Sequence, residues 1–425
     1  MIQIIENNPK ALKKILNRSQ LNLDDVNQVV KDIIENVKLF GDEKVLSYTK
    51  AFDHVEISNM RISNQEIKDA FERIDPTLLA DLKKAKENIY AYHLNQKISG
   101  YTLKPEDGII LTQVAKAIEN VGIYIPGGTA AYPSTVLMNA VPAAIAGVKK
   151  IVMITPPNQE GNIKDSILVA AAIAGVDEIY KVGGAQGIAA LAYGTASITK
   201  VDKIVGPGNI YVSMAKKQVS GYVGIDMIAG PSEILIIADE TANPDFIAAD
   251  LMGQAEHDIL SAAICLTPSK ALAEKVKRSI ESQITLLSRK DIIEKSLSNY
   301  GAIIITSGLD EAMELSNQIA PEHLELLVEN PFELVEKVQN AGSVFLGQYT
   351  PEPVGDYFAG PNHTLPTSGT ARFSSGLSTS DFMKKTSVSY YSKEALKKAK
   401  DSIIRLANEE GLTAHAKAVA IRFKE

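Results

Sequence analysis

The chain has 425 residues, of which 45% are hydrophobic and 22% charged, with 28 glycines and 18 prolines. This is the composition of a globular protein of two to four domains, at roughly 100–200 residues per domain, and it excludes disordered, collagen-like and small disulfide-stapled chains. The formal net charge of −7 argues against a nucleic-acid partner, because an acidic surface repels phosphate backbones. The single cysteine, Cys265, cannot form a disulfide within the chain, so we expect a cytoplasmic protein.

Residues 1–20 lack the basic stretch, apolar core and small-residue cleavage site of a secretory signal, and we expect a short helical arm there. The longest apolar run, Ile167 to Val176, is shorter than the roughly 20 residues that a membrane-spanning helix needs. We therefore expect no membrane segment.

From residue 20 to about residue 96, apolar residues recur at helical spacing among charged ones, which predicts surface helices. Beyond this tract, short apolar runs alternate with alanine-rich stretches of helix length. The runs are VGIYIP, KIVMITPP, EIYKVGG, DKIVGPG, EILIIAD, AAICLTP, AIIIT and SVFLG. This alternation of strands and helices predicts parallel sheets as far as about Gly347.

So long an α/β region exceeds one ordinary sheet. We therefore predict an α/β fold of two Rossmann-like parallel-sheet domains that share a cleft, with a helical N-terminal arm and a small C-terminal tail domain. Ligands in such sheets bind beyond the carboxyl ends of the strands, so functional residues are expected in the loops that follow the strands. Segment 348–380 is rich in Pro, Gly, Ser and Thr without clear periodicity, which indicates a functional loop near the site. An amphipathic helix is predicted over 392–407.

Three glycine-rich loops follow predicted strands, at residues 125–128 (IPGG), 183–187 (GGAQG) and 206–209 (GPGN). None has the spacing of a dinucleotide fingerprint or a P-loop, and a single loop of this kind is most simply a turn that needs a positive φ. Three such loops in successive strand–helix units would line one edge of one sheet, and there they could bind the phosphates of a nucleotide. Both interpretations remain open on pattern alone.

Gln254 and His257 lie three residues apart in a helix that we expect to begin after Asn243 and Pro244, so their side chains project from one helical face. This spacing suits metal ligands, although a lone histidine on a helix is more often structural. The chain has no HExxH motif and no CxxC pair, so a metal site would have to be assembled from distant segments.

Glu322 and His323 are adjacent in the segment APEHL, just after a proline. A carboxyl group and an imidazole could divide acid and base chemistry between them, since burial can raise the pKa of a glutamate towards neutrality. The alternative is a solvated loop. Asp356, which lies in the long loop before Asn362 and His363, could be a metal ligand, a turn former or a helix cap.

Glu410 and His415 lie in the C-terminal tail, where ordinary surface groups are the simpler interpretation. Two of the six histidines, His54 and His93, fall in the helical N-terminal region, and we expect them to be structural.

Taken together, these segments resemble the histidinol dehydrogenase family. The resemblance extends from about Val121 to Val419 and is carried by a set of motifs that is far more specific than any one of them. These motifs are VGIYIPGG, STVLMNAVPA, GGAQGIAALAYGT, VDKIVGPGN, IDMIAGPSE, DLMGQAEHD, APEHLEL, AGSVFLG, GDYFAGPNHTLPT and LTAHAKAV.

The resemblance implies one Zn²⁺ per subunit and a cofactor, NAD⁺. By motif, the zinc ligands fall on Gln254, His257, Asp356 and His415. General acid and base roles fall on Glu322 and His323, and the NAD contacts on Tyr124, Gln186 and Asn209. The substrate contacts fall on Ser232, Gln254, His257, His323, Asp356, Glu410 and His415.

The reaction implied is the oxidation of L-histidinol through bound L-histidinaldehyde to L-histidine, with two NAD⁺ consumed, in the last steps of histidine biosynthesis. The family's homodimers exchange C-terminal tails, which would place Glu410 and His415 in the partner's site. The implied domains are an arm, 1–20; a first α/β domain with the metal and catalytic residues, 21–124 and 233–378; a second with the NAD loops, 125–232; and an exchanged C-terminal domain, 379–425.

Two other activities fit parts of this pattern. A related zinc- and NAD-dependent dehydrogenase could act on another polar alcohol. A zinc hydrolase could use the Glu–His pair with metal-bound water, but it would leave the three glycine-rich loops without a role. The chain departs from the family at Ile259-Leu260-Ser261, where many relatives have a proline-containing turn, and this departure leaves the expected ligands untouched.

Overall fold

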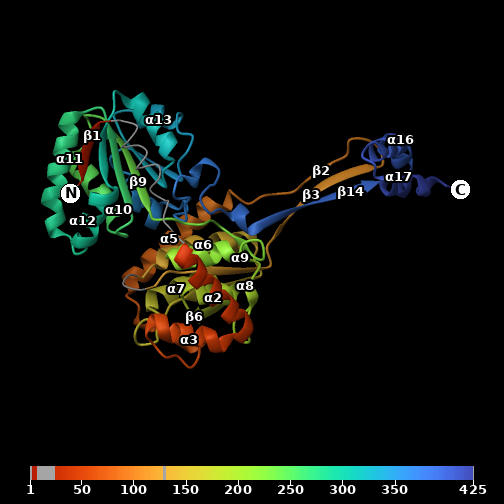
Figure 1. The fold of residues 1–425 in the computed structure, drawn as a ribbon, viewed down its shortest axis with the longest axis horizontal. Coiled ribbons are helices and arrows are strands. Elements are labelled where there is room, and N and C mark those ends of the chain that lie inside the picture. Colours follow the sequence, from red (N-terminus) through yellow and green to blue (C-terminus); the bar gives the residue numbers. More distant parts are fainter. Residues whose placement is uncertain (1, 7–23, 128–130, 425) are drawn as a thin grey trace. The chain divides into compact units, whose positions relative to one another are not determined.

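The structure is a computed structural model that describes residues 2–6, 24–127 and 131–424 (Figure 1). The chain forms two compact units. The larger unit contains residues 1–96 and 118–382, and the smaller one contains residues 97–117 and 383–425. The larger unit is built on parallel sheets with helices against them, which confirms the predicted α/β class.

The first sheet of the larger unit has five parallel strands in the order β6-β5-β4-β7-β8. The strands are β4 (Asn120–Tyr124), β5 (Lys150–Thr155), β6 (Glu178–Lys181), β7 (Lys203–Val205) and β8 (Gly224–Ile225). The chain starts at the central strand β4, proceeds to one edge and then returns to build the other. The order therefore reverses between β4 and β7, and ligands of such sheets bind beyond the carboxyl ends of the strands at such a reversal.

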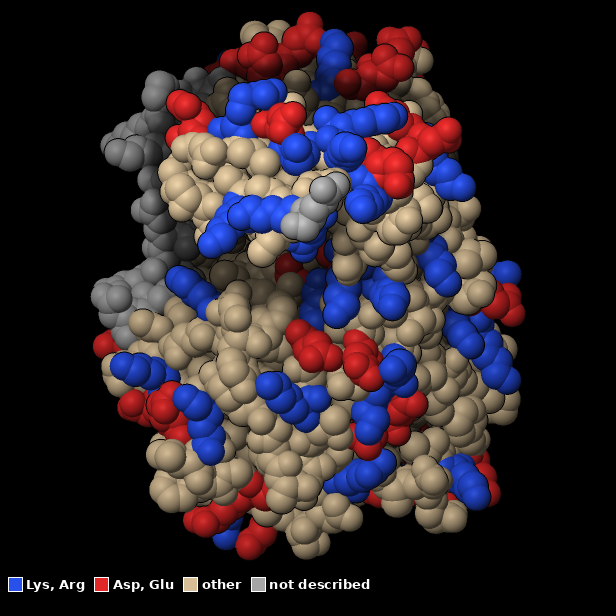
Figure 2. All heavy atoms as spheres, turned by 90° about the vertical axis from the view of Figure 1, so that its right-hand side faces the viewer, with Lys and Arg blue, Asp and Glu red and all other residues tan. Residues whose placement is uncertain are grey.

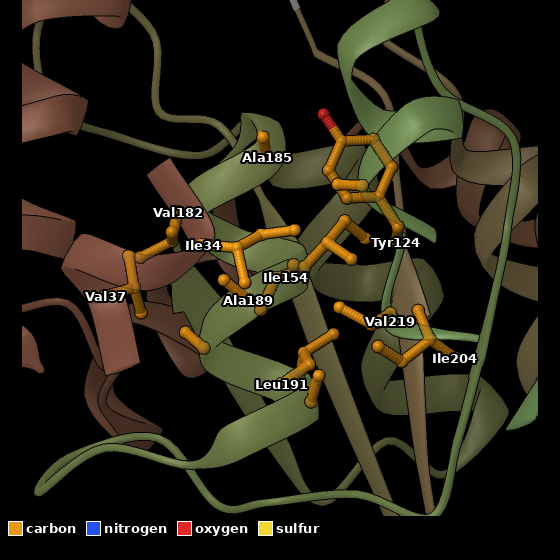
Figure 3. Close-up of a cluster of buried hydrophobic side chains, with 14 of the residues drawn as sticks. Ile34, Val37, Tyr124, Ile154, Val182, Ala185, Ala189, Leu191, Ile204 and Val219 are labelled. Carbon is orange, nitrogen blue, oxygen red and sulfur yellow. The ribbon is translucent and has the colours of Figure 1, made fainter. Parts of the chain in front are cut away.

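Helices pack against this sheet through a continuous apolar core (Figure 3). The apolar residues of α2 (Asp24–Phe40) recur at helical spacing, and they are buried against α8 (Gly184–Tyr193) and α9 (Ile210–Val219). The next helix, α3 (Asp42–Asp53), contributes Val45 to the same core. The structure thus places α2 and α3 on the five-stranded sheet, whose strands lie between residues 120 and 225, whereas the implied domains grouped these helices with 233–378.

Four more helices lie between residues 64 and 174 of the larger unit. They are α4 (Asn64–Arg73), α5 (Pro76–Leu94), α6 (Pro133–Ala146) and α7 (Asp165–Ala174). Helix α5 packs on α6, and α4 packs on α7. The N-terminal tract that the sequence predicted as surface helices is therefore helical from residue 24 to residue 94, apart from short connections.

The second sheet has six parallel strands in the order β1-β11-β10-β9-β12-β13. They are β1 (Gln3–Glu6), β9 (Glu233–Ala238), β10 (Ala262–Thr267), β11 (Ala302–Ile305), β12 (His323–Leu327) and β13 (Ser343–Leu346). One face carries α10 (Pro244–Ala255), α11 (Lys270–Gln283) and α12 (Lys290–Tyr300), and the other carries α13 (Leu309–Ile319) and α14 (Pro331–Val335). Helix α10 begins as predicted, with Asn243 accepting a hydrogen bond from the Asp245 amide.

The N-terminal arm differs from the prediction. Gln3–Glu6 is not helical but forms strand β1, which pairs in parallel with β11. Ile2 and the apolar members of β1 find an apolar partner on the sheet, and this long-range contact overrides the local helical pattern. The rest of the predicted arm, 7–20, lies outside the described residues.

The smaller unit combines an antiparallel sheet with helices. Its strands are β2 (Tyr101–Leu103), β3 (Ile109–Ala117) and β14 (Met383–Tyr391), in the order β14-β3-β2. It ends with α16 (Lys393–Glu409), α17 (Thr413–Ala420) and a 3₁₀ turn, Ile421–Phe423. The predicted helix over 392–407 is confirmed, and Ser392 caps it by accepting from the Ala395 amide. The unit also includes residues 97–117, which the implied tail domain, 379–425, left out.

The segment between β13 and residue 382 is mostly irregular and contains α15 (Glu352–Val354) and a π-helical turn, Gly355–Ala359. Hydrogen bonds tie it to α5 and to the chain that enters β9. The Asn88 amide donates to the Phe358 carbonyl (2.8 Å), and the Gly230 amide donates to Thr367 Oγ1 (2.6 Å). The loop thus connects α5 with the chain that enters β9, and its functional role stays a prediction.

None of the described helices is long and apolar enough to cross a membrane. On the face of the molecule shown in Figure 2, basic and acidic side chains are interspersed. The acidic excess of the chain is therefore not gathered on that face.

Candidate functional site

Glu322 and His323 stand at the beginning of β12 and are both buried, at 6% and 4% exposure. Because β12 pairs with β9, both side chains meet the backbone of Glu233 at the start of β9. Glu322 Oε2 accepts a hydrogen bond from the Glu233 amide (2.8 Å), and His323 Nδ1 lies 3.0 Å from the Glu233 carbonyl oxygen. The alternative of a solvated loop is therefore wrong for this pair.

The Glu233 carbonyl determines the tautomer of His323. A carbonyl oxygen can only accept, so Nδ1 carries the proton and Nε2 carries a lone pair. Nε2 is buried and has no hydrogen-bond partner among the described residues. It lies 3.8 Å from Asp356 Oδ1 and 3.9 Å from Glu352 Oε1. The imidazole therefore presents an unused acceptor to two carboxyl groups.

His323, Glu352 and Asp356 each offer one ligand atom, and these atoms lie within 4.8 Å of one another. Glu352 was missed by the sequence analysis. A signal was present, because Glu352 and Asp356 are four residues apart, and this spacing places both on one side of a helical turn. The group of three can hold either a proton or a cation.

Burial dominates the electrostatics of this cluster. It raises the pKa of Glu322 well above its ordinary value, and repulsion from Glu233, Asp356 and Glu352 adds to the effect. Burial raises the pKa of Glu352 to about 8 and that of Asp356 to about 6. Burial also lowers the pKa of His323 to about 4. Without a cation, the cluster consists of a neutral imidazole among carboxyl groups whose pKa values are all raised by burial.

Gln254 lies in the last turn of α10, and His257 follows the end of that helix beside the cluster. Gln254 is 1% exposed, and its Oε1 is buried without a hydrogen-bond partner in the described part of the chain. His257 lies just beyond the helix and is close enough to interact electrostatically with His323 and Glu352. A third histidine, His363, places Nδ1 3.1 Å from the Asp356 carbonyl oxygen, and burial lowers its pKa to about 4.

A cavity of about 550 Å³ opens beside His257. Its walls come from α5, the start of α6, the end of α10, the start of α12 and the π-helical turn. The lining residues are Leu78, Asp81, Leu82, Ala85, Ile89, Ala131, Tyr132, Pro133, Ser134, Leu137, Glu256, His257, Arg289, Tyr357 and Phe358. The cavity is large enough for a small molecule, which would lie beside His257 between α5 and α6.

The position of this cluster corrects one expectation. Glu322, His323 and Glu233 lie at the amino ends of β12 and β9, not in loops beyond the carboxyl ends. Helix α10 runs back along the sheet, so that its last residues return to the same amino edge. Ser232 immediately precedes β9 and is half-buried there, with its carbonyl accepting from the Ala262 amide (3.0 Å).

Glu410 and His415 belong to the smaller unit. Glu410 follows the last turn of α16, His415 lies in α17, and both are exposed. Their predicted role in the site stays a prediction.

The three glycine-rich loops all follow strands of the five-stranded sheet, as expected, and two of them meet at the last residue of β4. The buried hydroxyl of Tyr124 accepts a hydrogen bond from the Gly184 amide (3.3 Å) and points away from the apolar core (Figure 3). A Cβ atom at Gly206 would lie 2.1 Å from the Tyr124 carbonyl oxygen. The remaining loop follows β4 directly, but its Gly128 lies outside the described residues. Burial raises the pKa of Tyr124 to about 12, with a smaller contribution from Asp53.

The other two predicted cofactor residues flank Tyr124. Gln186 is 1% exposed, and neither of its side-chain polar atoms has a hydrogen-bond partner among the described residues. Asn209 caps α9 by accepting from the amides of Tyr211 (3.0 Å) and Val212 (3.1 Å). Tyr124 ends β4 and Asn209 follows β7, and the sheet order reverses between these two strands.

The family model of histidinol dehydrogenase matches residues 16–423. The chain belongs to the histidinol dehydrogenase family. The histidinol dehydrogenase of Clostridium acetobutylicum is 56% identical over 400 residues, which cover 94% of this chain and 93% of that protein. The histidinol dehydrogenase of Bacillus cereus is 55% identical over 425 residues, with 99% of each chain covered.

A solved structure agrees with these sequences. The crystal structure of histidinol dehydrogenase from Elizabethkingia anophelis matches with a TM-score of 0.94 at 40% identity and covers 99% of this chain and 98% of that one. The resemblance inferred from the motifs is therefore confirmed, and the chain is a member of a family of oxidoreductases.

Proposed function

We propose that the chain catalyses the NAD-dependent, four-electron oxidation of L-histidinol through bound L-histidinaldehyde to L-histidine. The observation that carries this proposal is the buried pair at the start of β12, where Glu322 and the unprotonated Nε2 of His323 face Glu352 and Asp356. Family membership supports histidinol as the substrate. Cytoplasmic histidine biosynthesis is the setting that we propose for the reaction.

His323 is proposed to accept the proton of the substrate alcohol as hydride leaves the carbinol carbon. Its Nδ1 proton is held by the Glu233 carbonyl, which leaves the Nε2 lone pair available. Burial keeps the pKa at about 4, so the ring is neutral at physiological pH and ready to act as a base.

Glu322 is proposed to exchange the proton of a water molecule that hydrates the bound aldehyde. The hydrate is again an alcohol, so a second hydride can leave its carbon, and one water and two NAD⁺ are consumed per histidine formed. Burial raises the pKa of Glu322 towards the range in which a carboxyl group can both accept and return a proton. The Glu233 amide holds the carboxyl group in place through its hydrogen bond to Oε2.

We propose one Zn²⁺ per subunit, held by Gln254, His257, Asp356 and His415. The residues of the larger unit fit such an ion, because the buried Gln254 Oε1 has no partner in the described part of the chain and the nearby carboxyl groups crowd together. When bound, zinc would orient the substrate and stabilise negative charge on it. Substrate contacts are proposed for the same four residues together with Ser232, His323 and Glu410.

Tyr124, Gln186 and Asn209 are proposed to contact NAD⁺. They lie at the carboxyl edge of the five-stranded sheet, next to the reversal of strand order, and Gln186 has unused polar atoms there. We further propose a homodimer, in which the C-terminal tail of each chain supplies Glu410 and His415 to the site of the other.

The test is the amount of NADH formed per L-histidinol consumed by the zinc-loaded enzyme, with a chelated sample as the control. Two NADH per histidinol, lost on chelation and restored by zinc, is the expected result. One NADH per histidinol would limit the reaction to the alcohol and remove the role of Glu322. If the enzyme forms no NADH from histidinol but does form NADH from another polar alcohol, the proposed substrate is wrong and the protein is a related dehydrogenase of that alcohol.

A second experiment separates base from ligand at His323. The His323→Asn variant should lose the oxidation of histidinol by a factor of about 10² or more and still retain zinc after dialysis, because the proposed ligands are intact. Glu322→Gln is its matched control, with one NADH formed per histidinol. Loss of zinc from the His323→Asn variant would make His323 a metal ligand and contradict its assignment as the base.

A further inference from the structure

A buried ion pair holds the glycine-rich loop 206–209 from behind. The Gly206 amide donates to Asp226 Oδ2 (2.8 Å), and the Gly206 carbonyl accepts from Lys216 Nζ (2.9 Å). The side chains of Lys216 and Asp226 pair with each other and are only 2% and 1% exposed. Both polar groups of this one residue are therefore fixed by two fully buried charges.

Stability alone is a poor explanation for such a pair. Removing two charges from water costs several kcal/mol per ion, and well-packed apolar residues often replace a buried pair without loss of stability. Lys216 lies in the middle of α9, and Asp226 directly follows β8, where it also accepts from the Met227 amide (2.6 Å). The pair thus connects a helix and a strand end through the loop that lies between β7 and α9.

The loop has little freedom to move once it is held. Gly206 has a φ of +110°, which disfavours other residues, and a Cβ atom there would lie 2.1 Å from the Tyr124 carbonyl oxygen. A Cβ atom at Gly208 would lie 3.1 Å from Cε1 of the Tyr124 ring. A rotation of the Gly206 peptide would therefore shift the loop against Tyr124, and it would also shift Asn209 at the N-terminus of α9.

The same pair begins the connection to the other sheet. After Asp226 the chain runs through Ala229, whose carbonyl accepts from Ser213 Oγ of α9 (2.9 Å), to Glu233 beside Glu322 and His323. Within a few residues, the chain thus passes from the proposed cofactor loop to the proposed catalytic pair.

We propose that Lys216 and Asp226 are positioning residues for the dinucleotide. The two side chains fix the Gly206 peptide, and the fixed loop keeps Tyr124 and Asn209 where the cofactor binds. This inference rests on the proposed NAD⁺ site. Neither residue touches the cofactor in this scheme, and their effect passes through the loop.

The experiment measures the affinity of the full-length, zinc-loaded protein for NADH by fluorescence titration, together with KM for NAD⁺, kcat and the melting temperature. One variant is Lys216→Met, which leaves the Asp226 charge without its partner. The other is the double variant Lys216→Met/Asp226→Asn, which removes both charges of the pair. The matched control is Glu178→Gln, at the opposite edge of the same sheet, where Glu178 accepts from Thr199 Oγ1 (2.9 Å) and pairs with Lys150 and Arg61.

Lys216→Met should weaken NADH binding and raise KM for NAD⁺ by about tenfold, the size of one lost hydrogen bond to a charged group, with kcat changed less than about twofold. The double variant should regain the melting temperature but not the affinity, because the Gly206 carbonyl still lacks its donor. Glu178→Gln should lower the melting temperature and leave NADH binding unchanged.

Three results would overturn the proposal. The double variant could recover the affinity for NADH along with the melting temperature. This result would mean that the two residues only neutralise each other's charge and do not position the loop. Lys216→Met could bind NADH within about twofold of the wild type, or Glu178→Gln could lose as much affinity as Lys216→Met. Failure of the wild-type protein to bind NADH is a separate outcome, which refutes the proposed NAD⁺ site before any variant is compared.

Discussion

Asp53 offers a direct test of how burial acts on a charged group in this protein. It ends α3, and its Oδ2 is buried without a hydrogen-bond partner in the described part of the chain. Burial raises the pKa of Asp53 from 3.8 to about 6, although the neighbouring His54 opposes the change. The folded protein therefore binds this proton more tightly than the unfolded chain does.

The perturbation is Asp53→Asn, which keeps the shape and removes the charge. The difference between the two pKa values corresponds to about 3 kcal/mol, and because Asp53 keeps partial contact with water we expect about 1–2 kcal/mol of it. A raised pKa gives stability that is present below about pH 4 and lost as the pH rises through about 6. The variant should therefore be more stable than the wild type by about 1–2 kcal/mol at pH 7.5, with a smaller gain at pH 5.

Urea unfolding at both pH values, followed by tyrosine fluorescence because the chain has 15 tyrosines and no tryptophan, measures this difference. Asp42→Asn is the control, since Asp42 lies in the first turn of the same helix, where its exposed carboxylate accepts from Ser197 Oγ (2.7 Å). It should give no gain in stability. Equal gains for Asp53→Asn at pH 5 and pH 7.5 would refute the reasoning, because a desolvated carboxylate must show the pH dependence.

Three further predictions concern packing and the two proposed sites. Gly206→Ala should lower the free energy of unfolding by about 3 kcal/mol or more and weaken NADH binding, because the new Cβ would clash with the Tyr124 carbonyl. Urea unfolding and NADH titration measure the two effects, and wild-type values in both would contradict the geometry. Gln254→Met should lower zinc retention in equilibrium dialysis while stabilising the chelated protein by about 1 kcal/mol, since it removes a buried oxygen without a partner; unchanged zinc content would exclude Gln254 as a ligand. Leu191→Ala, in the fully buried core of α8, should cost about 2–5 kcal/mol by urea unfolding and leave KM for NAD⁺ unchanged, and a loss below about 1 kcal/mol would show that the core closes around the gap.

Local signals predicted the elements that depend on nearby residues. Asn243 and Ser392 cap α10 and α16, because a short polar side chain can satisfy the free amides of a first turn wherever the helix later packs. The convergence of the loops after β4, β6 and β7 on one sheet edge was also predictable, because parallel strands present their carboxyl ends together.

Long-range pairing escaped the same reasoning. Strand β3 pairs with β14 in a register that joins Ile109 to Tyr391, and nothing in either strand identifies its distant partner. Glu352 was missed for a similar reason, since its four-residue spacing from Asp356 gains a meaning only when β12 brings His323 beside both carboxyl groups. The sequence identified Glu322 and His323 as a possible acid–base pair. It did not predict that the pair is buried at the amino edge of the sheet, because that burial depends on the return of α10 to the same edge.

The pairing of β1 has a consequence for the order in which a ribosome delivers this protein. The five-stranded sheet uses strands between residues 120 and 225, so it can assemble as soon as that stretch has emerged. Among the described strands, β1 pairs with β11 alone, at residues 302–305, and nearly 300 residues must be translated after β1 before this partner exists. During that interval the apolar residues of β1 lack the strand with which they pair in the described structure, and chaperones that shield such segments would act on β1.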